Sequence, residues 1–351
     1  MKAWRLDGPG ALHLDEVGDP EVRPGAVRVR MEASSLLSYL GAYVSGELGY
    51  LMPPKPFTPG GNGVGVVEAV GPDVWTLRPG QRVVISPHVV AAENSPEPPQ
   101  ILQGLTAAPE AAEMLAAWPD GTLAEKQLVP ASALTVIPAD LDHMSAEEIA
   151  PVSRAVVPYG GLLRARLAPG ETVVIHGATG AFGSAAVLVA TAMGARVVAA
   201  GRNPGKLAEL GSWPRVTAVP MTGSIERDTA ALRAAAGGGA HCALDMVGRA
   251  GDANGTLATL GSLRRGGRLV LMGSMRVPLP IDYNELMLSG HEIIGNYMYP
   301  PKAVSEVLDL AAAGLLDFGR IRRTTFALDE LPAAIEAAGA PNAPLVVMTV
   351  R

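Results

Sequence analysis

A strand, a glycine turn, a helix and a second strand follow one another in residues 171–206, and this pattern constrains the chain more than any other. Residues 172–175 are apolar and mostly β-branched, which is typical of a strand buried on both faces. The turn reads GATGAFG over residues 177–183, and a helix is predicted over 181–193. A second β-branched run at 196–200 predicts the closing strand. The order of these elements indicates a βαβ unit.

Each glycine of the turn has a separate predicted purpose. Gly177 makes the sharp bend, Gly180 lets the backbone approach a ligand, and Gly183 lets the helix pack close to the strand. The free N–H groups at the start of the helix, together with the helix dipole, form an anion site suited to a pyrophosphate. We therefore expect a dinucleotide here. The expected contacts are Gly177, Ala178, Thr179, Gly180, Ala181, Phe182 and Gly183.

The end of the second strand indicates which dinucleotide binds. Units that select NAD place an acidic residue at this point, where it bonds the ribose 2′-hydroxyl. This chain carries no acid between Gly201 and Lys206, and it places Arg202 directly after the glycine. Arg202 and Lys206 are predicted to pair with a 2′-phosphate, because a guanidinium offers a bidentate fork to such a group. We expect Gly201, Arg202 and Lys206 to contact NADPH; the alternative is that the two cations are ordinary solvated charges.

Composition excludes several classes of protein. Of 351 residues, 48% are hydrophobic and 18% charged, so a globular chain with room for two domains is expected. The net charge is −6 and no block of Lys and Arg stands out. We therefore expect no nucleic-acid partner and no nucleic-acid-binding surface. Cys242 is the single cysteine, which excludes an internal disulfide and a cysteine-rich zinc site.

Targeting signals do not stand out either. The start, MKAWRLDGPG, lacks the apolar core of a signal peptide. Residues 172–195 are almost free of charge, but their glycine turn predicts the buried centre of an α/β sheet rather than a membrane span. We expect a cytoplasmic protein without membrane contact.

The chain is predicted to form an α/β protein of two domains. Residues 1–150 read as short strands punctuated by Gly-Pro and Pro-Gly pairs, which indicates a β-rich barrel. Within them, 91–121 is rich in Pro and Ala and is interpreted as a lobe or long surface loop. Strands and helices alternate in 151–314, predicting a doubly wound parallel sheet of the Rossmann type, with Pro158 kinking or breaking its first helix. Residues 315–351 are expected to return to the barrel.

Six segments resemble the medium-chain dehydrogenase/reductase superfamily, and the resemblance covers nearly the whole chain. They are PGGNGVGVVEAVG (59–71), LRPGQRVV (77–84), DGTLAEKQLVP (120–130), LAPGETVVIHGATGAFGSAAV (167–187), LDMVG (244–248) and GGRLVLMG (266–273). The resemblance implies a GroES-like barrel domain that carries the substrate and a Rossmann domain that carries NADPH. The GATGAFG turn resembles that of the zinc-independent quinone oxidoreductase and enoyl reductase branch.

The zinc branch of the superfamily places ligands at positions that can be compared with this chain. Its cysteine after the second strand corresponds to Leu37, its His-Glu pair to Gly61 and Asn62, and its second cysteine to Ser153. Leu and Gly have no donor atom for zinc and Ser is a poor ligand, so no metal site is expected. The scattered histidines without ligand spacing are interpreted as ordinary surface or core residues: His88, His143 and His176.

Without zinc, the expected chemistry is hydride transfer from NADPH to a carbon activated by conjugation. Such a reduction places charge on an oxygen, so a hydroxyl or N–H donor is expected near it. Tyr39 stands where the zinc alcohol dehydrogenases carry the hydroxyl of their proton relay, and Tyr43 is the second candidate; the alternative is that both only line the cleft. Leu37 and Leu40 replace an Asn and an Asp common in the quinone oxidoreductases, and with Leu36 they predict an apolar wall for a hydrophobic enone or quinone.

The carboxyl ends of parallel strands line the ligand crevice of such a sheet, so residues after the later strands are further candidates. The expected cofactor contacts there are Val247, Gly273, Ser274, Asn296, Tyr297 and Met298, which could instead be simple loop residues. The edge strand predicted at 292–295 is expected to pair in a homodimer. Two alternatives for function stay open: a non-catalytic NADPH-binding sensor or structural protein, and a zinc-type alcohol dehydrogenase that has lost its metal.

Overall fold

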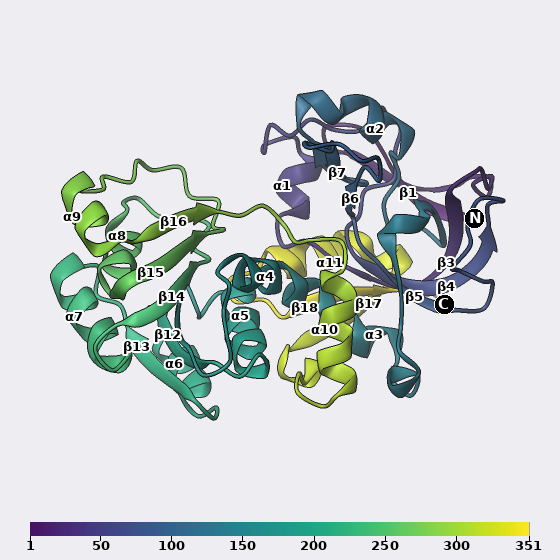
Figure 1. The fold of residues 1–351 in the computed structure, drawn as a ribbon. Coiled ribbons are helices and arrows are strands. Elements are labelled where there is room, and N and C mark those ends of the chain that lie inside the picture. The colour runs from purple at the N-terminus through teal and green to yellow at the C-terminus, as the bar shows by residue number, and fades with distance from the viewer. Residues whose placement is uncertain (351) are drawn as a thin grey trace. The chain divides into compact units, whose positions relative to one another are not determined.

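The computed structural model describes residues 1–350, and the chain divides into two compact units (Figure 1). The first unit comprises Met1–Ser153, Val304–Ala312 and Phe318–Arg351. The second comprises Arg154–Ala303 and Ala313–Asp317. In the described part of the chain, none of the helices is both long and apolar enough to cross a membrane.

The second unit is built on a parallel sheet. Its strands, in spatial order, are β13 (Val216–Pro220), β12 (Arg196–Gly201), β11 (Thr172–His176), β14 (Ala240–Asp245), β15 (Leu263–Leu271) and β16 (Glu292–Gly295). Every neighbouring pair in this order is parallel. The first strand of the unit therefore lies inside the sheet with the chain winding outward on both sides, which confirms the predicted Rossmann architecture.

Helices connect the strands of this unit. They are α4 (Val152–Arg164), α5 (Ala181–Ala192), α6 (Pro204–Gly211), α7 (Ile225–Ala235), α8 (Asn254–Gly261) and α9 (Tyr283–Ser289). The sheet interior is apolar: Val173, Val174 and Ile175 of β11 are fully buried. These residues are the β-branched run that predicts the strand.

Of the kink or break predicted at Pro158, the break does not occur. Helix α4 runs through Pro158 without a break, because Val156 and Leu162 on either side are fully buried and hold it by packing. Helix α7 begins at Ile225, because the Ser224 side chain accepts a hydrogen bond from the Arg227 N–H and caps the helix there.

The first unit contains a larger, mostly antiparallel sheet. Its strands, in order, are β10 (Leu134–Val136), β5 (Arg82–Ile85), β4 (Gly63–Val70), β3 (Ala26–Ser35), β18 (Leu345–Thr349) and β17 (Arg323–Ala327), with β9 (Lys126–Pro130) also pairing β3. Strand β18 is antiparallel to β3, so the C-terminal segment belongs to the same sheet as the N-terminal strands. A hairpin of β1 (Lys2–Gly8) and β2 (Ala11–Glu16) precedes the sheet.

The segment predicted as a lobe or loop is a small folded element. Strands β6 (His88–Val90), β7 (Gln100–Leu102) and β8 (Thr106–Ala107) form an antiparallel sheet. A 3₁₀ turn, Pro109–Ala111, leads into α2 (Ala112–Ala117). Val89, Ile101 and Leu115 are buried in one core cluster with residues of the larger sheet, so the element is anchored by apolar contacts.

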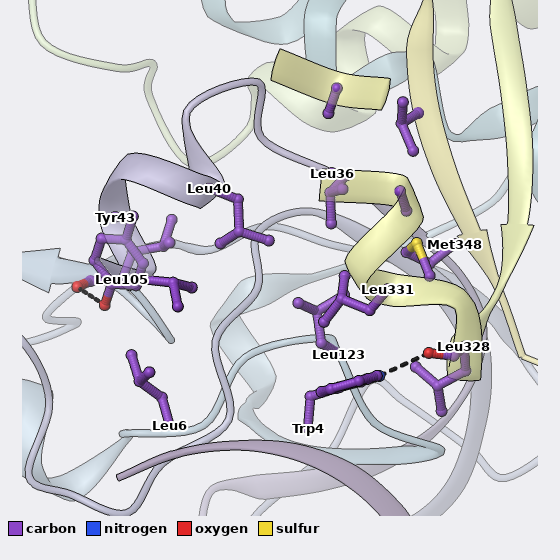
Figure 2. Close-up of a cluster of buried hydrophobic side chains, with 14 of the residues drawn as sticks. Trp4, Leu6, Leu36, Leu40, Tyr43, Leu105, Leu123, Leu328, Leu331 and Met348 are labelled. Atoms are coloured by element: carbon purple, nitrogen blue, oxygen red, sulfur yellow. Dashed lines mark hydrogen bonds between the residues drawn. The ribbon is translucent and has the colours of Figure 1, made fainter. Parts of the chain in front are cut away.

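A second apolar cluster joins distant segments of the first unit (Figure 2). It includes Leu40 and Tyr43 of α1 (Leu40–Val44) and Leu331 of α11 (Leu331–Gly339). The indole Nε1 of Trp4 donates to the carbonyl of Leu328 at 2.6 Å, so its polar atom is satisfied inside the cluster.

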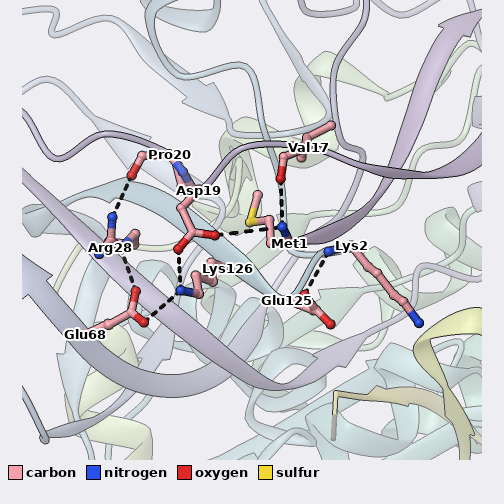
Figure 3. A network of polar contacts seen from close by, with 9 residues as sticks. All are labelled: Met1, Lys2, Val17, Asp19, Pro20, Arg28, Glu68, Glu125 and Lys126. Atoms are coloured by element: carbon pink, nitrogen blue, oxygen red, sulfur yellow. Dashed lines mark hydrogen bonds and ion pairs between the residues drawn. The ribbon is translucent and has the colours of Figure 1, made fainter.

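A polar network fastens the N-terminal strands to the same unit (Figure 3). The Lys126 ammonium lies 2.5 Å from Asp19 and 2.9 Å from Glu68, and the Arg28 Nε lies 2.6 Å from Glu68. The hydrogen bond from Lys126 lowers the pKa of the Glu68 carboxyl, against the effect of its partial burial.

Candidate active site

The glycine turn of the second unit has the close contacts that its sequence predicts. Gly177 has φ +80°, a left-handed conformation that glycine adopts without strain. A Cβ at Gly183 would lie 2.0 Å from the carbonyl oxygen of Gly177, so no other residue fits there. Helix α5 begins at Ala181, and its N-cap Gly180 has no side chain to occupy the first-turn N–H groups. The turn therefore presents backbone donors of the kind that bind phosphate.

The end of β12 packs on this turn. A Cβ at Gly201 would lie 2.6 Å from the Thr179 methyl group, so the strand end and the turn are in close contact. Arg202 is exposed beyond the strand. The Asn203 side chain accepts a hydrogen bond from the Lys206 N–H at 3.1 Å and caps α6. The two predicted phosphate-binding cations thus flank the first turn of a short capped helix.

Val247 brings three of the predicted segments together. Its side chain would lie 3.1 Å from a Cβ at Gly177, and its carbonyl oxygen 2.0 Å from a Cβ at Gly273. The glycine turn, the residues after β14 and the residues after β15 therefore meet at Val247. These contacts lie at the carboxyl ends of the strands, the edge at which doubly wound sheets bind ligands.

The residues after β16 form a constrained loop. The Asn296 side-chain amide donates to the Met298 carbonyl at 2.9 Å, and Met298 has φ +55°. A Cβ at Gly160 of α4 would lie 2.5 Å from that same carbonyl, so the helix and the loop approach closely. A non-glycine residue held at positive φ is often found at a functional site. Tyr297, which lies between Asn296 and Met298 in the sequence, is largely exposed. Ser274, after β15, completes the set of predicted contacts.

Sequence reasoning missed a buried polar group at this edge of the sheet. His176 ends β11, Asp245 ends β14, and the two are paired in register on neighbouring strands. The Asp245 carboxylate also accepts a hydrogen bond of 2.5 Å from the Thr256 hydroxyl of α8. His176 was interpreted as an ordinary histidine, and Asp245 lies inside the LDMVG motif. The available signal was that both residues end buried strands.

The two candidate tyrosines lie in different surroundings in the first unit. Tyr43 is fully buried, and its hydroxyl donates to the Leu105 carbonyl at 2.5 Å (Figure 2). Burial, with the neighbouring Tyr39, raises the pKa of the Tyr43 phenol. Tyr39, at the N-cap of α1, is only half-buried at the edge of the apolar cluster. This geometry favours Tyr39 over Tyr43 as a proton donor.

The predicted apolar wall is smaller than expected. Leu36 and Leu40 are buried in the core cluster among Leu331 and its neighbours, as Figure 2 shows, and they stabilise the fold. Leu37 alone is half-buried. A helix from the C-terminal segment covers the other two leucines, and local sequence does not reveal such a long-range contact.

The positions that correspond to zinc ligands are occupied by non-ligating groups. Leu37 Cδ2 would lie 3.7 Å from a Cβ at Gly61, so these two positions are adjacent, as a shared metal site requires. The Ser153 hydroxyl donates to the Ala150 carbonyl at 2.8 Å. Within residues 1–350, no group of three or more His, Cys, Asp or Glu side chains is arranged to hold a metal ion. The residues present do not fit a catalytic zinc.

Comparisons with known proteins agree with this fold. Residues 23–139 match the family model of the alcohol dehydrogenase GroES-like domain, and residues 181–313 match that of the zinc-binding dehydrogenase. An alcohol dehydrogenase of Moraxella sp. (strain TAE123) is 34% identical over 319 residues, which cover 90% of this chain and 89% of the relative. Quinone oxidoreductase-like protein 2 of Mus musculus is 31% identical over 269 residues, which cover 75% of this chain and 64% of the relative.

Among solved structures, alcohol dehydrogenase TADH from Thermus sp. ATN1 matches with a TM-score of 0.83 and 26% identity over 100% of both chains. The chain belongs to the medium-chain dehydrogenase/reductase superfamily, as its motifs predict. It is an oxidoreductase of that superfamily, with a GroES-like domain and a Rossmann domain of the kind that binds a nicotinamide cofactor in this family.

Proposed function

We propose that this protein is a zinc-independent, NADPH-dependent oxidoreductase that reduces a quinone or an α,β-unsaturated carbonyl. The observation that carries the proposal is the pairing of Leu37 with Gly61 at the positions that correspond to zinc ligands, and the close backbone contact of Gly183 with Gly177 supports the dinucleotide-binding turn. Without a metal to polarise an isolated carbonyl, a substrate that is activated by conjugation is favoured.

The choice of NADPH rests on the end of β12. Gly201 packs against Thr179, so no acidic side chain can occupy that position to bond a ribose 2′-hydroxyl. Arg202 is exposed and Lys206 half-buried, which leaves two cations next to the turn to pair with a 2′-phosphate. When bound, NADPH supplies the hydride.

The residues of the first unit would handle the proton. Reduction of an enone at its β-carbon would place negative charge on the carbonyl oxygen; a proton donated to that oxygen gives the enol, which tautomerises to the saturated carbonyl. Tyr39 is the proposed donor, because its side chain is half-buried and reaches the edge of the core. Leu37 adds apolar surface beside it, which favours a hydrophobic substrate.

The alternative functions differ in whether the cofactor is turned over and with which class of substrate. Relatives named alcohol dehydrogenase keep simple alcohols and aldehydes in consideration, and a non-catalytic sensor would bind NADPH without consuming it. The test is NADPH oxidation, followed by absorbance, with a panel of enones, quinones, aldehydes and alcohols plus NADP⁺. Turnover confined to enones or quinones supports the proposal. Turnover confined to alcohols and aldehydes contradicts it, and cofactor binding without any turnover favours the sensor.

We also propose a homodimer formed through the second unit. Strand β16 ends the sheet order, and beside it in sequence α9 exposes Tyr283 (81% exposed), Met287 and Leu288. An open edge next to an apolar helix face suits a second copy paired about a two-fold axis. Sedimentation at micromolar concentration should show a dimer, and Met287→Arg should shift it toward monomer; a wild-type monomer contradicts the proposal.

The cytoplasmic location stays a prediction.

A further inference from the structure

We propose that Asp245 is a positioning residue that holds the nicotinamide end of the cofactor site, with His176 and Thr256 keeping its carboxylate in place. The inference rests on the proposed function, in that a nicotinamide dinucleotide binds at the glycine turn. It concerns residues that do not touch the reacting atoms. Their effect is transmitted through Val247 and Gly273, two of the predicted cofactor contacts.

The carboxylate of Asp245 organises the loop after β14. Its Oδ1 accepts a hydrogen bond from the Val247 N–H at 3.0 Å, and its Oδ2 accepts the Thr256 hydroxyl. Nδ1 of His176 lies 3.2 Å from Oδ1, although the ring is not aligned for a hydrogen bond. Three different elements, β11, the loop after β14 and α8, thus converge on one side chain.

The backbone of the same residue organises the loop after β15. The Asp245 carbonyl accepts hydrogen bonds of 3.0 Å from the N–H groups of both Met272 and Gly273. Gly273 in turn packs against the Val247 backbone. The side chain of Asp245 therefore fixes one loop and its carbonyl fixes the other, and these loops meet the glycine turn at Val247.

The electrostatics require this carboxylate to be ionised. The Asp245 side chain is only 4% exposed. Burial acts to raise the pKa of its carboxyl, but the contact with His176 and the hydrogen bonds from Thr256 and Val247 outweigh burial and lower the pKa. An ionised carboxylate accepts at both oxygens, whereas the acid form would have to donate from one of them. A buried charge is costly unless it is fully bonded, and such groups gather at functional sites.

His176 is itself held from the far side. A Cβ at Gly255 would lie 2.5 Å from Nε2 of His176, so the imidazole packs directly on the backbone of α8. The ring is confined between that helix and Asp245. Any side chain at position 255 would push the ring toward the carboxylate and disturb it without removing a polar group. Gly255→Ala is therefore a second, milder way to test the arrangement.

The experiment compares two ligands on each variant, using the full chain. NADPH contacts both ends of the site, while adenosine 2′,5′-bisphosphate contacts only the adenosine end. In Asp245→Ala we expect the Kd for NADPH to rise about tenfold, the typical effect of losing one hydrogen bond to a charged group. The Kd for adenosine 2′,5′-bisphosphate should stay within about twofold, an allowance well below that tenfold effect. Gly255→Ala should move the ratio of the two Kd values in the same direction by less.

Asp228→Ala is the matched control. Asp228 is buried in the same unit and accepts hydrogen bonds from the Thr222 N–H, the Thr222 hydroxyl and the Gly223 N–H. Its loss should lower the Tm and leave the ratio of the two Kd values unchanged. An unchanged ratio in Asp245→Ala, or in Gly255→Ala when Asp245→Ala does not fold, overturns the inference and makes Asp245 a structural residue only.

Failure of the proposed cofactor choice gives a different result. In that case the wild-type protein binds NADH more tightly than NADPH, and ADP-ribose more tightly than adenosine 2′,5′-bisphosphate. The same ratio is then measured with NADH against ADP-ribose. A selective loss of NADH in Asp245→Ala still supports the positioning role, and equal loss of both ligands overturns it.

Discussion

The predicted cofactor positions of the second unit and the position of Gly61 in the first unit differ in how much room they leave for a side chain. In the second unit, Cβ atoms added at Gly183 and Gly273 would each lie 2.0 Å from a backbone carbonyl oxygen, so only glycine fits. In the first unit, a Cβ at Gly61 would meet Leu37 at 3.7 Å, an ordinary van der Waals contact. One set of glycines is required by close approach of backbones. The other glycine stands at a place where a side chain has room.

This difference indicates which half of the chemistry each unit keeps. At the proposed dinucleotide site, Gly183 and Gly273 make contacts that leave no room for a Cβ, and the buried Asp245 carboxylate bonds the neighbouring Val247 N–H. The ligand positions hold hydrocarbon and a serine whose hydroxyl already donates to a backbone carbonyl. We infer that the cofactor half of the superfamily's chemistry is retained and the metal half is replaced by direct proton donation.

The largest expected effect tests that replacement. Tyr39→Phe should lower kcat by roughly 10²–10⁴-fold, the usual contribution of a general acid, with the Kd for NADPH nearly unchanged. Stopped-flow and steady-state rates with the best enone or quinone would measure it. A change of less than about threefold, far below that range, would assign the proton to solvent and make Tyr39 a lining residue.

Tyr43→Phe is the matched control for that variant. It leaves the buried Leu105 carbonyl without its partner, so the free energy of unfolding should fall by about 1–3 kcal/mol. The kcat of this variant should stay near that of the wild type. A large loss of kcat with unchanged stability would instead identify Tyr43 as the donor.

A smaller effect is expected at the phosphate end of the proposed dinucleotide site. Arg202→Ala should weaken NADPH by about 1.5–3 kcal/mol, because one charge-assisted contact to phosphate is lost, and leave NADH almost unchanged. Arg227→Ala, at another exposed arginine of the same unit, should change neither. Isothermal titration measures both cofactors, and equal loss for NADPH and NADH in Arg202→Ala would exclude a 2′-phosphate contact.

The parts of the fold that local sequence encodes were predictable. The β-branched runs of β11 and β12 and the glycine turn between them predict elements whose observed bounds differ by only a residue. Local chemistry suffices there because strand, turn and helix contact one another directly.

The features that escaped prediction depend on contacts between distant segments. The burial of Leu36 and Leu40 is set by α11, nearly at the other end of the chain. The approach of His176 to Asp245 depends on the register of β11 against β14, which the motif around each residue does not contain. Pro158 lies inside a helix because packing on both sides outweighs its local preference.

The most direct test of the central claim is metal analysis of the purified protein combined with an activity assay in chelator. The ligand positions Leu37, Gly61 and Ser153 cannot hold a catalytic zinc, so we expect no stoichiometric zinc per chain. NADPH oxidation with an enone or quinone should be the same before and after chelator treatment. Stoichiometric zinc that leaves together with the activity, and restores it when added back, would contradict the account.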